Sequence, residues 1–243
     1  MSLIVQKFGG TSVADAERIR NICGIIAETK AQGHQVVVVL SAQGDTTDDL
    51  IAKMDEINPN ASAREKDVLL SVGEQVSISL AAMCMESMGI PAISLTGWQA
   101  GIRTNSQHGN ASIQNINHDL IDHYLAQGMV VFVAGFQGID DNGNITTLGR
   151  GGSDTTAVAL AAWLNADLCQ IYTDVDGVYT ADPRKYAEAK KYESITYDEM
   201  LVLIDGGAQV LHKKSVLTAK QYRVLVQVLS SFQRIPGTNV YGY

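Results

Sequence analysis

The 243-residue chain is acidic, and its composition excludes several classes of protein. Apolar residues make up 46% of the sequence and charged residues 18%, which excludes a disordered chain and is enough for one large domain with a buried core. The formal net charge of -8 does not provide the basic surface that nucleic-acid binding needs. Any site for an anionic ligand must therefore gather positive charge locally.

Nothing in the sequence indicates export or insertion into a membrane. The first residues lack the charged region, apolar core and cleavage site of a signal peptide. The longest apolar stretch, Val68–Met85, contains Glu74 and several polar residues, so it is interpreted as a buried helix rather than a membrane span. Cys23, Cys84 and Cys169 form no C-x-x-C pair, and buried thiols in a reducing cytoplasm are expected.

The first third of the chain alternates between strand and helix patterns. Residues 3–8 predict a strand that ends on Gly9-Gly10, after which Thr11 or Ser12 is expected to cap a helix. Isoleucines from Ile19 to Ile26 recur at helical spacing. Residues 35–40 form a continuous β-branched run, typical of a strand buried on both faces.

The same alternation continues to the end of the chain, and no repeat or linker interrupts it. It predicts an α/β fold with a mostly parallel sheet covered on both faces, in one domain with room for two lobes. The remaining helices are expected at 63–88, 153–165, 197–204 and 214–221, the remaining strands at 91–95, 129–134, 168–173 and 224–229, and a hairpin at 136–148.

Polar, glycine-rich segments follow four of the predicted strands. In parallel sheets, ligands bind beyond the carboxyl ends of the strands, so these segments are expected to form one site. The segments are Lys7–Ser12, Ser41–Asp48, Gly149–Asp154 and Thr173–Arg184.

The first segment, Lys7–Ser12, has the properties of an anion-binding turn. Gly9 and Gly10 let the backbone approach a phosphate, and the N–H groups of a helix start attract anions. Lys7 would add a point charge, although an ordinary glycine turn with a surface lysine fits the segment equally well. The sequence contains no G-x-x-x-x-G-K-[ST] motif, which excludes that type of P-loop.

The segment Gly149–Asp154 only partly resembles a G-x-G-x-x-G fingerprint, because Asp154 stands where glycine is needed. We interpret it as a second anion-binding loop at a helix start. Arg150 can grip a carboxylate with two parallel hydrogen bonds. Asp154 is expected in the first helical turn, where the helix dipole alone would also favour a carboxylate.

Two further features fit a ligand site but also have ordinary explanations. Glu74 is the only charged residue between Asp67 and Glu86, so it must be paired or face a cleft, where it could hold a ligand ammonium. In the segment after residue 173, Tyr179 could line an adenine or ribose and Arg184 could reach phosphate. A surface turn followed by a helix, capped by Asp182 and starting at Pro183, explains that segment as well.

Taken together, six ordered motifs resemble the amino-acid kinase superfamily and, within it, the catalytic domain of the aspartate kinases. They extend in order over essentially the whole chain, which makes the resemblance specific. The motifs are KFGGTSV at Lys7–Val13, SAQGDTTD at Ser41–Asp48, SVGE at Ser71–Glu74, GFQG at Gly135–Gly138, TLGRGGSDTTA at Thr147–Ala157 and TDVDGVYTADPR at Thr173–Arg184.

This resemblance implies a three-layer αβα sandwich that forms one catalytic domain over residues 1–243. It implies phosphorylation of L-aspartate by ATP with Mg²⁺, giving 4-phospho-L-aspartate, the first step of lysine, threonine and methionine biosynthesis. Lys7 and Asp154 would be catalytic. Nucleotide contacts are implied for Lys7, Gly9, Gly10, Ser41, Thr173, Asp174, Tyr179 and Arg184, and aspartate contacts for Thr47, Glu74, Phe136, Arg150, Gly151, Gly152 and Ser153.

The sequence departs from the family pattern in two places. Gln209 stands where family members usually carry a lysine near the nucleotide phosphates, and Lys213 or Lys214 could substitute for that charge. Members also usually continue into C-terminal ACT regulatory domains, and none is expected within residues 1–243, whether these are a trimmed form, a natural catalytic-only form or a chain that needs a regulatory partner. Feedback inhibition of the chain alone is therefore not expected. A homodimer is common in the superfamily, and a separate regulatory chain is a possible partner.

Two alternative functions stay open at this point. One is a related kinase acting on glutamate, N-acetylglutamate, carbamate or UMP, although the combination of SVGE with GRGGSD favours aspartate. The other is a non-catalytic sensor of nucleotide or amino acid, which only Gln209 favours. His108, His118, His123 and His212 have no metal-ligand spacing and are expected to be surface or core residues.

Overall fold

The computed structural model describes residues 1–183, 185–186 and 188–242, and the centre of the fold is an eight-stranded sheet. The strand order is β10-β12-β11-β9-β1-β2-β6-β3, and all neighbouring pairs except β11 with β12 are parallel. The strands are β1 (Leu3–Phe8), β2 (Gln35–Leu40), β3 (Ala92–Leu95), β6 (Val130–Ala134), β9 (Leu168–Thr173), β10 (Ser194–Thr196), β11 (Val226–Ser230) and β12 (Thr238–Tyr241).

Strand β2 shows why the central strands are apolar on both faces. Its side chains alternate between two hydrophobic cores, so that Val36, Val38 and Leu40 join one core while Val37 and Val39 join the other. A strand covered by helices on one face only would alternate apolar with polar residues. The continuous β-branched run therefore follows from the central position of β2 between two helical layers.

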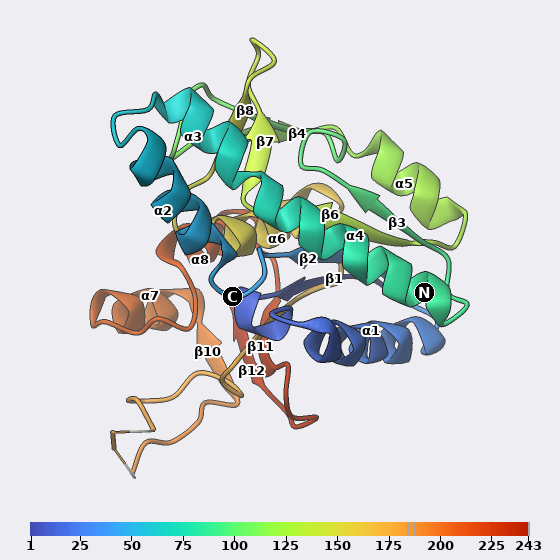
Figure 1. The fold of residues 1–243 in the computed structure, drawn as a ribbon. Helices are drawn as coiled ribbons and strands as arrows, with labels where there is room; N and C mark the ends of the chain where they lie inside the picture. The colour runs from blue at the N-terminus through green and yellow to red at the C-terminus, as the bar shows by residue number, and fades with distance from the viewer. Residues whose placement is uncertain (184, 187, 243) are drawn as a thin grey trace.

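Helices cover each face of this sheet (Figure 1). On one side, α1 (Ala16–Ala31) and α4 (Val72–Ser87) enclose the core that contains Phe8 and Phe132. On the other side, apolar residues of α5 (Asp119–Ala126), α6 (Gly152–Trp163), α7 (Tyr197–Asp205) and α8 (Lys213–Tyr222) form the second core. The predicted α/β, three-layer αβα fold is confirmed.

A smaller, four-stranded sheet lies at the end of the main sheet where β7 and β8 are labelled in Figure 1. Its strand order is β5-β4-β7-β8, and α3 (Ala63–Leu70) packs on β8 and on α2 (Thr46–Ile57). The β7–β8 pair is the predicted hairpin. The strands are β4 (Ile102–Thr104), β5 (Ile113–Ile116), β7 (Gln137–Ile139) and β8 (Ile145–Thr147).

Two helix predictions need correction. The expected helix over 63–88 is divided at Ser71 into α3 and α4. The expected cap at Thr11 or Ser12 is wrong. Gly10–Ser12 form a short 3-10 turn, and α1 is capped by Asp15, which accepts a hydrogen bond from the Arg18 N–H. Asp15 takes this role because the turn delays the start of α1.

The segment Ala63–Ser87, which comprises α3 and α4, is long and apolar enough to cross a membrane by length and composition alone. Core helices of soluble proteins pass the same test. Here α4 packs against α1, β3 and β6, and Glu74 within it is buried. These contacts agree with the interpretation of this segment as a helix of the folded core.

The helix expected after Asp182 and Pro183 is not formed by the described residues of that segment, which make turns. The backbone N–H groups of Lys185 and Tyr186 both donate to the carbonyl of Asp182. Arg184, to which a phosphate contact was assigned, lies outside the described residues.

Candidate functional site

The four glycine-rich segments meet at one cleft of about 380 Å³. Three of the segments meet because β9, β1 and β2 are parallel neighbours, so the chain leaves each strand at the same edge of the sheet. The fourth, Gly149–Asp154, follows β8 of the smaller sheet and leads into α6. The residues that line the cleft are Lys7, Gly9, Gly10, Ser41, Ala42, Gly44, Thr47, Glu74, Phe136, Gly149, Arg150, Gly151, Gly152, Ser153, Asp154, Thr173, Gln209, Val210 and His212.

Lys7 and Asp154, which both line the cleft, form a buried ion pair. Lys7 lies near the end of β1, and Asp154 lies in the first turn of α6. The Lys7 Nζ and an Asp154 Oδ are 2.7 Å apart, and the two side chains are only 11% and 7% exposed. Burial, with the Asp154 charge nearby, raises the pKa of the Cys169 thiol beneath them, so Cys169 stays neutral. The pair thus fixes an ammonium at the start of a helix, where an anion would be attracted.

The turn after β1 is held against the neighbouring loops. A Cβ on Gly10 would lie 2.8 Å from the carbonyl oxygen of Ala42, so only glycine permits this approach. The Ser12 and Ser231 hydroxyls lie 2.8 Å apart, and the Ser231 N–H donates to the Thr173 carbonyl. Ser231 therefore joins the turn after β1 to the end of β9. Its place after an expected strand was the only signal for Ser231 in the sequence.

Glu74 supplies a buried carboxyl group to the cleft. Its Oε1 accepts the Ala42 N–H at 3.2 Å, while its buried Oε2 has no hydrogen-bond partner among the described residues. Burial raises the pKa of Glu74 to about 8, and the Ala42 hydrogen bond only partly opposes this rise. The internal salt bridge that the sequence left open is not formed within the described chain. A cationic group of a ligand at Oε2 would restore the charged form.

The loop before α6 adds a cation to the same cleft. Arg150 is exposed and lines the cleft, and its guanidinium makes no hydrogen bond or ion pair within the described residues. Gly151 caps α6 in the left-handed region at φ 72°, and a Cβ there would meet the His212 ring at 2.0 Å. Phe136 also has a positive φ, 70°, which is rare for a bulky residue and persists here at the cleft wall.

The structure brings together most of the residues assigned to the site from sequence, with three exceptions. Asp174 and Tyr179 do not line the cleft. Asp174 accepts a hydrogen bond from Thr173, and the Tyr179 hydroxyl donates to Asp176. The third is Arg184, which is not described.

The segment around Gln209 differs from expectation in two respects. Gln209 does line the cleft, but Lys213 pairs with Asp205 and Lys214 binds Asn110 and the Leu148 carbonyl, so neither lysine lines the cleft. His212, expected as an ordinary surface or core residue, lines the cleft beside Gly151. The sequence signal that could have assigned His212 to the site was its position three residues after Gln209, where the chain departs from the family pattern.

The amino acid kinase family model matches residues 2–230. The chain belongs to the amino acid kinase family. Among its relatives in this family, an aspartokinase of Bacillus sp. (strain MGA3) is 56% identical over 238 residues, which cover 98% of this chain and 58% of the relative. The chain thus spans less than two thirds of the length of that relative.

Solved structures of other amino acid kinases have the same fold. The aspartate kinase from Synechocystis is 47% identical, with a TM-score of 0.89, and the match covers 100% of this chain and 40% of that one. Aspartokinase III of E. coli, in a complex with aspartate and ADP, is 30% identical with a TM-score of 0.89, and the match covers 99% of this chain and 64% of that one.

Proposed function

We propose that this chain transfers the γ-phosphoryl group of ATP to the side-chain carboxylate of L-aspartate, giving ADP and 4-phospho-L-aspartate. The observation that carries the proposal is the combination, in one cleft, of an anion-binding end at Lys7 with a buried Glu74 and an Arg150 guanidinium. Within the described residues, Glu74 Oε2 has no hydrogen-bond partner and Arg150 makes no ion pair. The similarity to an aspartokinase solved with aspartate and ADP supports it. The product would enter lysine, threonine and methionine biosynthesis, in the cytoplasm.

In the proposed complex, each end of the amino acid has a counterpart in the cleft. The substrate ammonium would pair with Glu74, whose Oε2 has no other partner within the described chain. A carboxylate would accept two hydrogen bonds from Arg150. Thr47, Phe136, Gly151, Gly152 and Ser153 would form the walls of this half of the cleft.

Catalysis would then consist of positioning and charge neutralisation. The attacking carboxylate is already ionised near neutral pH, so no general base is needed. Two anions must approach one another, and Lys7 together with the α6 N-terminus would stabilise the charge on the transferring group. Gly9, Gly10, Ser41 and Thr173, which also line the cleft, would contact the nucleotide.

A magnesium ion fits this site only as a companion of the nucleotide. The described residues contain no cluster of three or more His, Cys, Asp or Glu that could hold a metal. Mg²⁺ commonly binds through one or two carboxylates and the substrate phosphates, and Asp154 is the carboxylate beside the anion-binding turn. When bound, the ion would neutralise phosphate charge.

Trapping the product with hydroxylamine tests the proposed function. With MgATP and L-aspartate, we expect aspartyl hydroxamate to accumulate with stoichiometric ADP. Glutamate, N-acetylglutamate, carbamate and UMP serve as the comparison panel. ADP release with one of these and none with aspartate would refute the substrate assignment.

The same assay separates the enzyme from a sensor. Gln209 lines the cleft in place of the lysine usual in the family, which is the observation that favours a non-catalytic role. Tight binding of ATP without product from any acceptor would establish that second function. Sedimentation of the purified chain tests the expected homodimer.

A further inference from the structure

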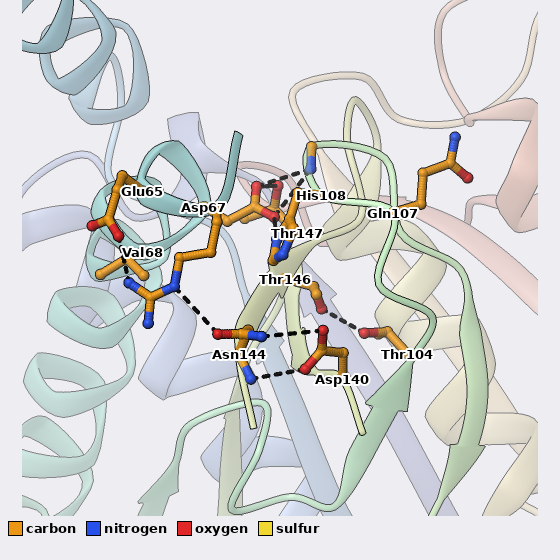
Figure 2. A network of polar contacts seen from close by, with 12 residues as sticks. Glu65, Asp67, Val68, Thr104, Gln107, His108, Asp140, Asn144, Thr146 and Thr147 are labelled. Atoms are coloured by element: carbon orange, nitrogen blue, oxygen red, sulfur yellow. Dashed lines mark hydrogen bonds and ion pairs between the residues drawn. The ribbon is translucent and has the colours of Figure 1, made fainter. Parts of the chain in front are cut away.

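A buried carboxylate outside the cleft connects the two segments that carry Glu74 and Arg150. Asp67 lies in α3 and is 1% exposed. It accepts hydrogen bonds from the Thr147 hydroxyl at 2.5 Å, from the Gly109 N–H at 3.0 Å, and from His108 Nδ1 at 2.8 Å. Figure 2 shows Asp67 facing His108 and Thr147, which come from two other segments.

One side of this connection leads to Arg150. Thr147 is the last residue of β8, three positions before Arg150, and its carbonyl accepts the Ala111 N–H at 2.8 Å. A Cβ on Gly149 would lie 3.0 Å from the Gly109 carbonyl oxygen. Residues 108–111 are therefore fixed by Asp67 and in turn support the backbone that presents Arg150.

The other side leads to Glu74. Asp67 lies in α3, two helical turns before Glu74, and the Ser71 carbonyl between them accepts the Gln137 side-chain amide at 2.7 Å. Glu74 lies in the first turn of the next helix, α4, in a buried position. One carboxylate thus joins the helix that leads to the proposed ammonium site with the loop that leads to the proposed carboxylate site.

We infer that Asp67, with His108 and Thr147, is a positioning residue that sets the spacing between Glu74 and Arg150 and so the fit of the amino-acid substrate. The inference rests on the proposed function. Asp67 does not line the cleft and touches no reacting atom. Its loss should therefore weaken binding of the amino acid and leave binding of the nucleotide unchanged.

Asp67→Asn is the direct test, and Asp140→Asn is its matched control. The asparagine keeps the size of the side chain but turns an N–H₂ group toward donors. Asp140 is also 1% exposed; it accepts hydrogen bonds from the Asn142 and Asn144 N–H groups of the β7–β8 turn and from the Ser106 side chain, so unlike Asp67 it does not connect α3 with β8. We expect Asp67→Asn to raise the KM for aspartate about tenfold, with the KM for ATP changed less than twofold. Asp140→Asn should change neither KM.

A second pair of variants covers the case in which Asp67→Asn does not fold. His108→Asn keeps a donor near the position of Nδ1, whereas His108→Ala removes it, so the first should retain most of the aspartate affinity and the second should lose it. Thr147→Val removes only the hydroxyl and should act in the same direction as His108→Ala.

The results separate the inference from the proposed function. If the unmodified chain forms no aspartyl hydroxamate, the proposed function and this inference both fail. If it does form the product, equal losses for aspartate and ATP in these variants, or an unchanged KM for aspartate, would leave the proposed function standing and overturn the positioning role.

Discussion

The ionisable residues of this cleft differ in whether a neighbouring charge within the protein compensates for their burial. Lys7 and Asp154 are paired at 2.7 Å, so the cost of burying each is offset by the other. Glu74 is buried, and its Oε2 has no hydrogen-bond partner within the described chain, so the cost of burying its charged form is compensated only when a cation binds. Before any ligand binds, the first pair is balanced and Glu74 is not.

Lys7→Ala tests the first of these charges. The substitution removes the ammonium proposed to stabilise the transferring phosphoryl group, and we expect kcat to fall by at least about 100-fold. Initial rates with saturating MgATP and aspartate measure this. Lys213→Ala is the control, because Lys213 pairs with Asp205 in an exposed position. Near wild-type turnover of Lys7→Ala would contradict the proposed mechanism.

Glu74→Gln tests the second charge through stability. The pKa of Glu74 is about 8 in the folded chain against 4.5 for an ordinary glutamate, so the folded state holds a proton that the unfolded state releases between these values. The free energy of unfolding therefore falls as pH rises from about 4.5 to 8. Removing the charge should stabilise the ligand-free protein by about 1 kcal/mol or more at pH 8, or roughly 2–4 °C in Tm.

Calorimetry at pH 5 and pH 8 measures this effect, which should nearly vanish at pH 5. The exposed Glu86→Gln, in the same helix, is the control. The stabilised variant should at the same time lose aspartate affinity, because an amide cannot pair with an ammonium as a carboxylate does. A lower Tm at pH 8 would show that the Glu74 carboxylate stabilises the ligand-free fold.

Among the helices and strands, those with buried apolar faces were predictable from the sequence, and those with mostly exposed residues were missed. The strand at 35–40 was predictable because both faces of β2 are buried. Helix α2 has no buried residue, and β4 and β5 are short strands with exposed polar positions, so none left a periodic apolar signal. The cap of α1 was misassigned because the 3-10 turn that precedes it depends on the Ser12–Ser231 contact, 219 residues apart.

The candidate site shows the same division. Lys7, Arg150 and Asp154 were predictable because glycine-rich segments after strands mark ligand loops in any parallel sheet. Asp67 was not, because a lone carboxylate in a polar helix carries no sign of the two segments that it meets in the fold. Gln209 could be flagged as a departure, but only the structure shows where Lys213 and Lys214 bind.

The start of α6 depends on a glycine with two separate requirements. Gly151 has a positive φ, and a Cβ there would also collide with His212. Gly143, in the β7–β8 turn, has a similar φ of 79° with nothing within 4 Å of a Cβ. Gly151→Ala and Gly143→Ala thus carry similar backbone strain, but only the first displaces a wall of the cleft.

We expect Gly151→Ala to raise the KM for aspartate at least about tenfold, whereas Gly143→Ala should lower only Tm. Steady-state kinetics and thermal melts of the two variants provide the comparison. Equal kinetic effects would mean that backbone strain alone accounts for the loss.

For the whole molecule, the question is whether two cores and two sheets behave as one domain. The main sheet separates the two hydrophobic cores, yet every central strand contributes to both. Ile22 is fully buried in one core and Leu160 in the other. Because the strands are shared, a cavity in either core should weaken the same cooperative unit.

Ile22→Ala and Leu160→Ala should each lower the free energy of unfolding by about 2–5 kcal/mol. In urea, circular dichroism and the fluorescence of Trp98 and Trp163 should report a single transition for each variant. Separate transitions for the two probes would instead divide the chain into two independently folding units.

The position of β1 has a consequence for synthesis of the protein. The first strand of the chain lies in the middle of the sheet, between β2 and β9, and its pairing with β9 begins at Leu168. During translation, the edge of β1 that pairs with β9 has no partner until β9 has been synthesised. The nascent chain must keep this apolar edge from aggregating until about two thirds of the polypeptide has emerged, which makes the early intermediate a natural client for chaperones.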